Sequence, residues 1–148
     1  MTDQAKIQRA ITEIIGAIGE DAEREGLYGT PRRVAEMYAD IFSGVGVDPA
    51  EELQVGYELG HREMVVVRDI AFYSMCEHHL LPFFGTVHVG YIPDMKGRVV
   101  GLSKIARVVE IIARRPQIQE RMVSEIADTI VRGLNPSGVA VVVQAEHM

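Results

Sequence analysis

The segment Ser74-Met75-Cys76-Glu77-His78-His79 brings one thiol and two imidazoles within four residues, and Cys76 is the only cysteine of the chain. A Cys-x-x-His spacing lets one turn place a sulfur and a nitrogen on one ion, at about 2.3 Å and 2.0–2.1 Å for zinc. The segment therefore indicates a metal site with Cys76 and His79 as ligands. The alternative is a buried structural cysteine beside solvated histidines.

Two ligands are too few for a zinc site, because a catalytic zinc usually has three protein ligands and a water. His147, far along the sequence, is a candidate third ligand or a proton carrier. The alternative is again a solvated histidine.

A second group of residues suits a compact anion. Ser103, Lys104 and Arg107 lie at the start of a predicted helix, where free backbone N–H groups and the helix dipole bind phosphate. Residues 96–121 carry seven basic and two acidic side chains, a local charge of +5 in a chain whose net charge is −6. A polyphosphate fits this pattern although the sequence has no P-loop, and a solvated helix face is the alternative.

Gln119 and Glu120 lie near the start of the next predicted helix. A carboxylate there can accept the paired N–H donors of a guanine edge, or it can complement the helix dipole. On these two residues alone, the dipole interpretation is favoured.

Composition limits the class of protein. The 148 residues are 47% hydrophobic and 24% charged, which suits one packed domain and excludes disordered, collagenous and coiled-coil classes. The negative net charge argues against general nucleic-acid binding. We expect no membrane span, because no apolar run approaches the length that one needs. The single cysteine agrees with a reducing compartment, so a cytoplasmic protein is expected.

The first part of the sequence has helical periodicity. Isoleucines at helical spacing from Ile7 to Ile18 predict an amphipathic helix. Thr30 and Pro31 predict the start of a second helix, with Thr30 as its N-cap. Residues 45–62 carry glycine, Asp-Pro and paired glutamates and predict a loop-rich connection. We expect residues 1–62 to form an N-terminal helical region.

From residue 64 the periodicity predicts strands and then helices. Strands are expected over 64–73 and 85–92, with a short one over 97–101. Ser103 opens a helix that Pro116 ends, a second helix follows with its apolar stripe from Ile118 to Ile130, and residues 138–144 form a last strand. This order predicts an α+β fold with helices on one face of a mainly antiparallel sheet, and residues 63–148 form its catalytic domain.

The last strand bears on where the domain ends. Val139, Val141 and Val143 alternate with Ala140 and Val142, so the strand is expected to be buried on both faces. A buried strand needs a following element to cover it. We therefore expect the domain to be truncated at its C-terminal end.

Five sequence blocks closely resemble GTP cyclohydrolase I, in the order of that family. They are Cys76-Glu-His-His-Leu-Leu-Pro-Phe, His88-Val-Gly-Tyr-Ile-Pro, Gly101-Leu-Ser-Lys-Ile-Ala-Arg, Arg115-Pro-Gln-Ile-Gln-Glu-Arg and Gln144-Ala-Glu-His-Met. The upstream Thr30-Pro-Arg-Arg-Val-Ala-Glu-Met-Tyr matches as well. The similarity runs from about residue 5 to the end of the sequence, and five blocks in register are highly specific.

The resemblance implies the tunnelling fold. In that fold, subunits join their sheets edge to edge into a pentameric barrel, two barrels stack into a homodecamer, and active sites lie at subunit boundaries. It also implies zinc-dependent conversion of GTP and water to formate and 7,8-dihydroneopterin triphosphate, the first step toward folate or tetrahydrobiopterin.

The resemblance also implies roles for individual residues. Cys76 and His79 resemble the zinc ligands, and His78 and His147 the acid–base histidines. Glu120, with Gln119, resembles the residue that anchors guanine. The side chains that resemble the triphosphate contacts are Arg33, Ser103, Lys104 and Arg107.

The sequence departs from the family at its end. A second zinc-binding cysteine and a phosphate-binding arginine are expected just beyond His147-Met148, so the 148 residues alone should bind zinc weakly and turn over poorly. One alternative is a non-catalytic relative that keeps the fold without the third zinc ligand. Another is a different tunnelling-fold enzyme acting on a pterin or deazapurine.

Overall fold

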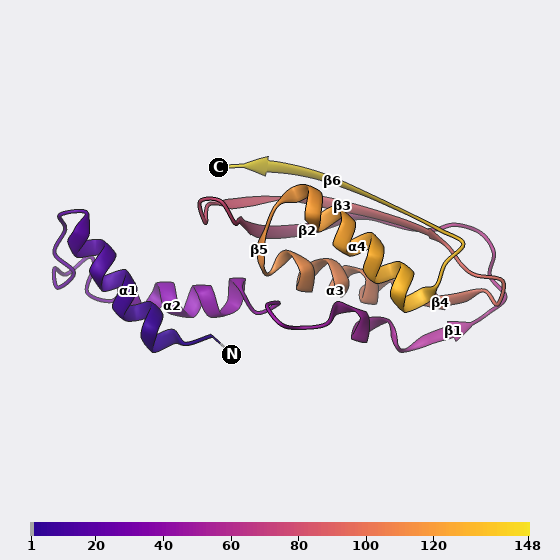
Figure 1. Ribbon diagram of the computed structural model, residues 1–148, viewed down its shortest axis with the longest axis horizontal. Coiled ribbons are helices and arrows are strands. Elements are labelled where there is room, and N and C mark those ends of the chain that lie inside the picture. Colours follow the sequence, from indigo (N-terminus) through magenta and orange to yellow (C-terminus); the bar gives the residue numbers. More distant parts are fainter. Residues whose placement is uncertain (1) are drawn as a thin grey trace. The chain divides into compact units, whose positions relative to one another are not determined.

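The computed structural model describes residues 2–148 (Figure 1). By packing, the chain forms two compact units, one ending at Ser43 and the other spanning Gly44–Met148. The domain boundary predicted between residues 62 and 63 stays a prediction. The elements in chain order are α1 (Gln4–Ala17), α2 (Thr30–Ile41), the 3₁₀ helix η1 (Pro49–Leu53), β1 (Gly56–Glu58), β2 (Val65–Cys76), β3 (Pro82–Ile92), β4 (Arg98–Val100), α3 (Leu102–Ala113), β5 (Pro116–Gln117), α4 (Gln119–Leu134) and β6 (Gly138–His147).

The first unit contains α1 and α2, as the isoleucine spacing and the Thr-Pro pair predicted. Asp3 caps α1 by accepting a hydrogen bond from the backbone N–H of Lys6 at 2.9 Å. Of the isoleucine stripe, Ile15 is buried, whereas Ile18 is 72% exposed. The predicted N-cap of α2 is wrong by one residue, because Gly29 is the cap and Thr30 is already helical.

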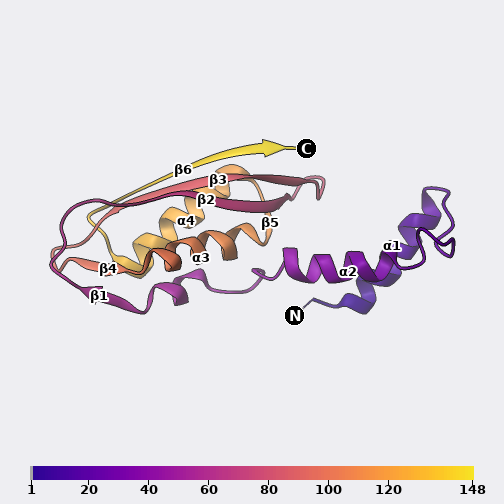
Figure 2. The same ribbon diagram turned by 180° about the vertical axis from the view of Figure 1, so that it is seen from behind.

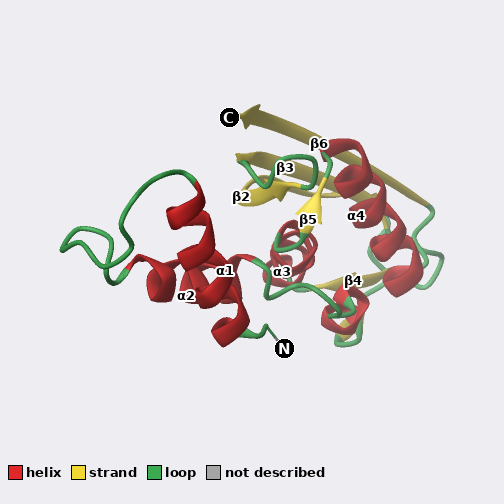
Figure 3. Ribbon diagram, turned by 60° about the vertical axis from the view of Figure 1, so that its left-hand side comes forward, coloured by secondary structure: helices red, strands yellow, loops and turns green. Residues whose placement is uncertain are grey.

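The second unit has two layers. Its main sheet has the strand order β5-β2-β3-β6; β2 pairs antiparallel with β3, and β3 with β6. The short β5 pairs parallel with the end of β2. Helices α3 and α4 lie on one face of this sheet, as Figures 1 and 3 show and the view from behind in Figure 2 repeats. The predicted α+β fold, with helices on one face of a mainly antiparallel sheet, is confirmed.

The core lies between the two layers. The apolar stripes predicted for the two helices point into it, and Ile105 and Ile112 of α3 and Met122 and Ile126 of α4 are fully buried. Burying each such side chain is worth about 1.5–3 kcal/mol. The helices are therefore held against the sheet mainly by apolar contact. The inward residues of β3 are buried in the same core: Phe83, Val87, Val89 and Tyr91.

The last strand differs from its prediction. Val139, Val141 and Val143 pack against the core, but Val142 on the opposite face is 55% exposed. The expectation that the strand is buried on both faces is wrong for the single chain, because within the second unit α3 and α4 cover one face of the sheet only. A close approach fixes the β3–β6 pairing, since a Cβ on Gly85 would lie 1.9 Å from the carbonyl oxygen of Gln144.

Residues 45–62 are more ordered than predicted. The side chain of Asp48 caps η1 by accepting from the backbone N–H of Ala50 at 3.0 Å. Strand β1 pairs antiparallel with β4, which was predicted as a short third strand. The two strands form a separate two-stranded sheet, which sequence periodicity had not indicated. None of the helices within residues 2–148 is long and apolar enough to cross a membrane.

Candidate active site

The Cys-Glu-His-His segment forms the tight turn between β2 and β3. Strand β2 extends to Cys76, three residues further than predicted. The backbone N–H of Cys76 donates to the carbonyl of Leu81, and the N–H of Leu80 donates to the carbonyl of Cys76, both at 2.8 Å. Leu80 takes a left-handed conformation with φ of 53°. The turn is thereby closed at both ends and fixes the backbone that carries both histidines.

The side chains of this turn face different surroundings. Cys76 is half-buried and packs against the hydrophobic core. His78 and His79 are exposed, and their ring centroids lie 6.4 Å apart. A thiol and an imidazole therefore share one turn at the surface, which is the donor chemistry that zinc prefers.

His147 lies at the same end of the sheet. The β3–β6 register places it opposite Phe83, and the two rings stack at 4.8 Å between centroids with an interplanar angle of 1°. The backbone N–H of Met148 donates to the carbonyl of Pro82, the first residue of β3 after the turn. The antiparallel ladder thus brings a histidine distant in sequence to the strand end that follows the Cys76 turn.

The start of α4 lies at this end too. Gln119 Nε2 donates to the carbonyl of Val143 on β6 at 3.1 Å. Glu120 is exposed in the first turn of α4, where its charge complements the helix dipole. The structure therefore brings six of the predicted site residues to one end of the second unit: Cys76, His78, His79, Gln119, Glu120 and His147.

A complete metal site is not formed by these residues. No three histidine, cysteine, aspartate or glutamate side chains within residues 2–148 are grouped so that they could hold a metal ion. Cys76 and His79 fit zinc by their chemistry and their shared turn. His147 does not join them in such a group.

The predicted phosphate residues lie elsewhere in the second unit. Helix α3 begins at Leu102 with Gly101 as its cap, so Ser103 is its second residue rather than its first. The C-terminal end of α3 approaches the Cys76 turn, because Ser74 Oγ donates to the carbonyl of Ala113 at 2.7 Å. The ten residues from Ser103 to Ala113 span about 15 Å of helix. The start of α3, which carries Ser103 and Lys104, is thus distant from the turn within one chain, and Figure 1 shows the course of this helix.

Lys104 has a partner in the single chain. Its Nζ lies 2.8 Å from Glu52 Oε2, in an ion pair between α3 and η1. The hydrogen bond and charge of Lys104 lower the pKa of Glu52, whereas burial raises it. The charge of Arg107 also lowers this pKa. Arg107 lies further along α3 and lines a cavity of about 200 Å³ beside β2. The positive charge predicted here is present and partly neutralised by Glu52.

Arg33 belongs to the first unit. Its Nη2 donates to Thr30 Oγ1 at 2.7 Å, within the first turn of α2. No geometry relates Arg33 to the residues of the second unit, so its phosphate role stays a prediction.

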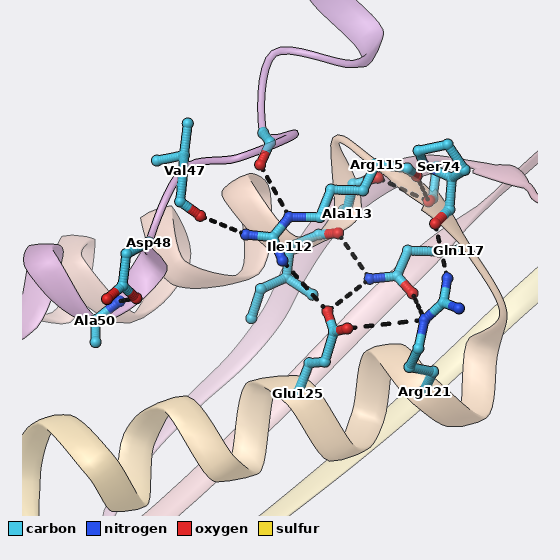
Figure 4. Close-up of polar contacts among 12 residues, drawn as sticks. Val47, Asp48, Ala50, Ser74, Ile112, Ala113, Arg115, Gln117, Arg121 and Glu125 are labelled. Carbon is cyan, nitrogen blue, oxygen red and sulfur yellow. Dashed lines mark hydrogen bonds and ion pairs between the residues drawn. The ribbon is translucent and has the colours of Figure 1, made fainter.

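A buried polar network beside the turn was missed by the sequence reasoning. Gln117 is 1% exposed and donates from Nε2 to the carbonyl of Ile112 at 3.1 Å and to Glu125 Oε2 at 2.9 Å. Its Oε1 accepts from Nε of Arg121 at 2.9 Å (Figure 4). The only sequence signal was a polar residue between a helix-ending proline and the apolar stripe of the next helix.

The fold and these positions define the class of protein. With α3 and α4 on one face of a mixed, mainly antiparallel sheet and helices preceding it, the chain has the α+β architecture of the tunnelling-fold enzymes. Comparison with known proteins identifies the family within that class.

A family profile described as GTP cyclohydrolase I matches residues 7–148. A protein named GTP cyclohydrolase 1 from Dehalococcoides mccartyi is 67% identical over all 148 residues, which cover 78% of that protein. Proteins of the same name from Pelotomaculum thermopropionicum and Carboxydothermus hydrogenoformans are 63% and 59% identical over the whole chain, covering 78% and 77% of their lengths. The chain belongs to the GTP cyclohydrolase I family and is an enzyme of this type.

Proposed function

We propose that this enzyme converts GTP and water to formate and 7,8-dihydroneopterin triphosphate with the help of zinc, as the first step toward folate or tetrahydrobiopterin. One observation carries the proposal: the Cys76 turn, His147 and the start of α4 lie together at one end of the second unit. That end would then hold the proposed metal ligands, the proposed proton carriers and an acceptor for a purine edge. Family membership supplies GTP as the substrate.

Cys76 and His79 would hold the zinc ion as two of its ligands. When bound, zinc would acidify a water molecule for addition to C8, the guanine carbon between N7 and N9. The half-buried position of Cys76 suits this role, because partial exclusion of water strengthens the attraction between a thiolate and a cation.

The histidines would move protons during the ring opening. An imidazole can both donate and accept a proton, which suits protonation of the purine nitrogen and then of the departing amine. His78 is exposed in the turn, and stacking on Phe83 fixes the ring plane of His147. These two histidines thus combine an accessible proton carrier with one of fixed orientation.

Glu120 and Gln119 would hold the guanine edge, and Ser103, Lys104, Arg107 and Arg33 the triphosphate. A carboxylate accepts both N–H groups of a guanine edge, and a helix N-terminus with a lysine favours phosphate. Contacts with the triphosphate, remote from the reacting carbon, would orient the purine for reaction.

The separation of the two groups along α3 supports an active site shared between subunits. If Cys76 and Lys104 of one site come from different chains, mixing Cys76→Ser and Lys104→Ala proteins as subunits of one oligomer would raise activity above that of either variant alone. Random mixing of equal amounts predicts about one quarter of the wild-type sites. A single-chain site predicts no recovery, which would refute the shared arrangement.

Two open sheet edges support pairing of subunits edge to edge, and the homodecamer of two pentameric rings is proposed from the resemblance to the family. Within residues 2–148, β6 has a strand partner on one side only, and β5 pairs with β2 only at Met75 and Cys76. Long open edges are templates for pairing with another chain. Native mass spectrometry would test the subunit number, and a monomer that turns over GTP would refute the proposal. The cytoplasmic location and the absence of nucleic-acid binding stay predictions.

A non-catalytic relative that keeps the fold is the second candidate. It is favoured by the absence of a three-residue metal group within the described residues 2–148. A formate-release assay with GTP, run on the complete gene product with measured zinc content, separates the two candidates. Formate release that depends on zinc supports the enzyme, and its absence supports the non-catalytic relative.

A further inference from the structure

Glu77 separates the proposed zinc ligand Cys76 from the proposed proton carrier His78, and it is held at two points. Its backbone N–H donates to the carbonyl of Gln117 at 3.0 Å, next to the parallel pairing of Cys76 with Gln117. Its carboxylate accepts a hydrogen bond from Arg121 Nη2 at 2.5 Å. Fixing both ends of Glu77 restrains the residues on either side of it.

Arg121 is itself oriented by several acceptors. Its Nη2 also donates to the carbonyl of Pro116 at 2.8 Å, and its Nε donates to Gln117 Oε1. Gln117 cannot turn freely, because its amide is buried and also donates to Ile112 and Glu125 (Figure 4). The guanidinium plane is thereby set by a buried network, and Glu77 meets a donor of fixed position.

The pair is poorly placed to serve stability alone. The side chains of Arg121 and Glu77 are 39% and 33% exposed, and ion pairs at such exposure contribute little to stability. The same arginine follows Glu120 directly in the first turn of α4. The contact therefore links the segment of the proposed purine acceptor to the turn of the proposed zinc ligands.

We propose that Arg121 is a positioning residue, which acts through Glu77 to hold the Cys76–His79 turn at a fixed place relative to the start of α4. This inference rests on the proposed function. Outer residues that orient metal ligands typically change metal affinity or activity about 10–100-fold when they are removed.

The test replaces Arg121 by methionine, which keeps the apolar stem and removes the donors. Arg132→Met is the matched control, because Arg132 lies on the same helix and pairs with Asp48 at 2.5 Å near its other end. Both variants are made in the complete gene product. The measurements are the zinc dissociation constant, kcat and KM for GTP, and amide exchange of residues 76–81 in the metal-free protein.

For Arg121→Met we expect zinc binding to weaken and kcat to fall, each about 10–100-fold, with KM changed less than about threefold and faster exchange of the turn. Arg132→Met should leave all of these unchanged. The zinc affinity and kcat of Arg121→Lys should lie between those of the two methionine variants, because one ammonium cannot reproduce the separate Nε and Nη2 contacts. Zinc affinity and kcat equal in the two methionine variants would overturn the proposal.

A double-mutant cycle with Glu77→Gln tests whether Arg121 acts through Glu77. We expect the double variant to match Arg121→Met within about twofold, whereas independent effects would multiply and overturn the proposed route. If the unaltered protein neither binds zinc nor releases formate, the proposed function fails. Amide exchange of the metal-free variants then decides the positioning role separately, and equal rates in the turn overturn it.

Discussion

Replacing Gln117 by leucine tests how much the buried network beside the Cys76 turn contributes to stability. Leucine has a similar volume and no polar atoms, so the change removes the hydrogen bonds with Ile112, Glu125 and Arg121 without opening a large cavity. Every buried side-chain nitrogen or oxygen within residues 2–148 has a hydrogen-bond partner. Any polar group that lacks a partner in the variant therefore lost it through this substitution.

The expected cost follows from the partners. A hydrogen bond with a charged group is worth about 1.5–3 kcal/mol and a neutral one about 0.5–1.5 kcal/mol. Glu125 and Arg121 are partly exposed and can turn to water, so the lower values apply and the sum is about 3.5 kcal/mol. For a unit of this size, that loss lowers Tm by about 15 °C.

The assay is thermal and urea unfolding of the metal-free protein, which keeps zinc affinity out of the comparison. Gln54→Leu is the control, because Gln54 is exposed and such substitutions usually change stability by less than about 0.5 kcal/mol. A loss below about 1 kcal/mol for Gln117→Leu would show that these hydrogen bonds do not stabilise the fold as proposed. It would mean that water replaces the amide or that the network relaxes without strain.

Three further predictions follow from particular contacts. Lys104→Ala should weaken binding of GTP about tenfold or more and leave guanosine binding nearly unchanged, as isothermal titration would measure; equal weakening would exclude a phosphate contact. The lowered pKa of Glu52 means that its pair with Lys104 stabilises the fold above the ordinary glutamate pKa of about 4.3 and is lost as pH falls through the lower folded value. The Tm difference between wild type and Glu52→Gln should therefore disappear on acidification, and a constant difference contradicts the assignment. Gly85→Ala should disrupt the β3–β6 pairing and cost several kcal/mol, because its Cβ would meet a backbone oxygen; urea unfolding that shows no loss would contradict the close approach.

The two long helices of the second unit were predictable from sequence because their burial repeats at helical spacing. Ile105, Ile112, Met122 and Ile126 all lie in the core, as their spacing predicts. Periodicity is a local signal, so it identifies a helix and its buried face without knowledge of the partner. The same signal identified α1, but burial of its isoleucines depends on what covers them, and Ile14 and Ile18 stay exposed.

Strand ends and the small sheet were less predictable, because pairing across the chain determines them. Polar residues of the Cys-Glu-His-His segment indicated a loop, yet pairing of Met75 with Pro82 extends β2 to Cys76. The bulge between Val67 and Ile70, where Asp69 has a φ of 58° and its N–H donates to His88 Nδ1, also interrupts a run that looked continuous. Such features depend on a partner strand that local patterns do not reveal.

In the candidate site, too, some residues were predictable from local sequence patterns and others depend on contacts across the chain. The Cys76 turn and Glu120 were predicted as parts of the site from their residue types and from the resemblance, and the register of β6 brings His147 to the same end. Gln117 and Arg121 were missed, because a glutamine after a proline has no distinctive pattern until its buried contacts are known. The distance of Lys104 from the turn was equally hidden, since it depends on the direction of α3 against the sheet.

Zinc content and formate release, measured together on the complete gene product and its Cys76→Ser variant, decide whether the turn at the end of β2 is the centre of the reaction. We expect the unaltered protein to contain about one zinc per chain and to release formate from GTP, and we expect the serine variant to lose both. Formate release at an unchanged rate by the zinc-depleted serine variant would show that the Cys76 turn is not the centre of the reaction.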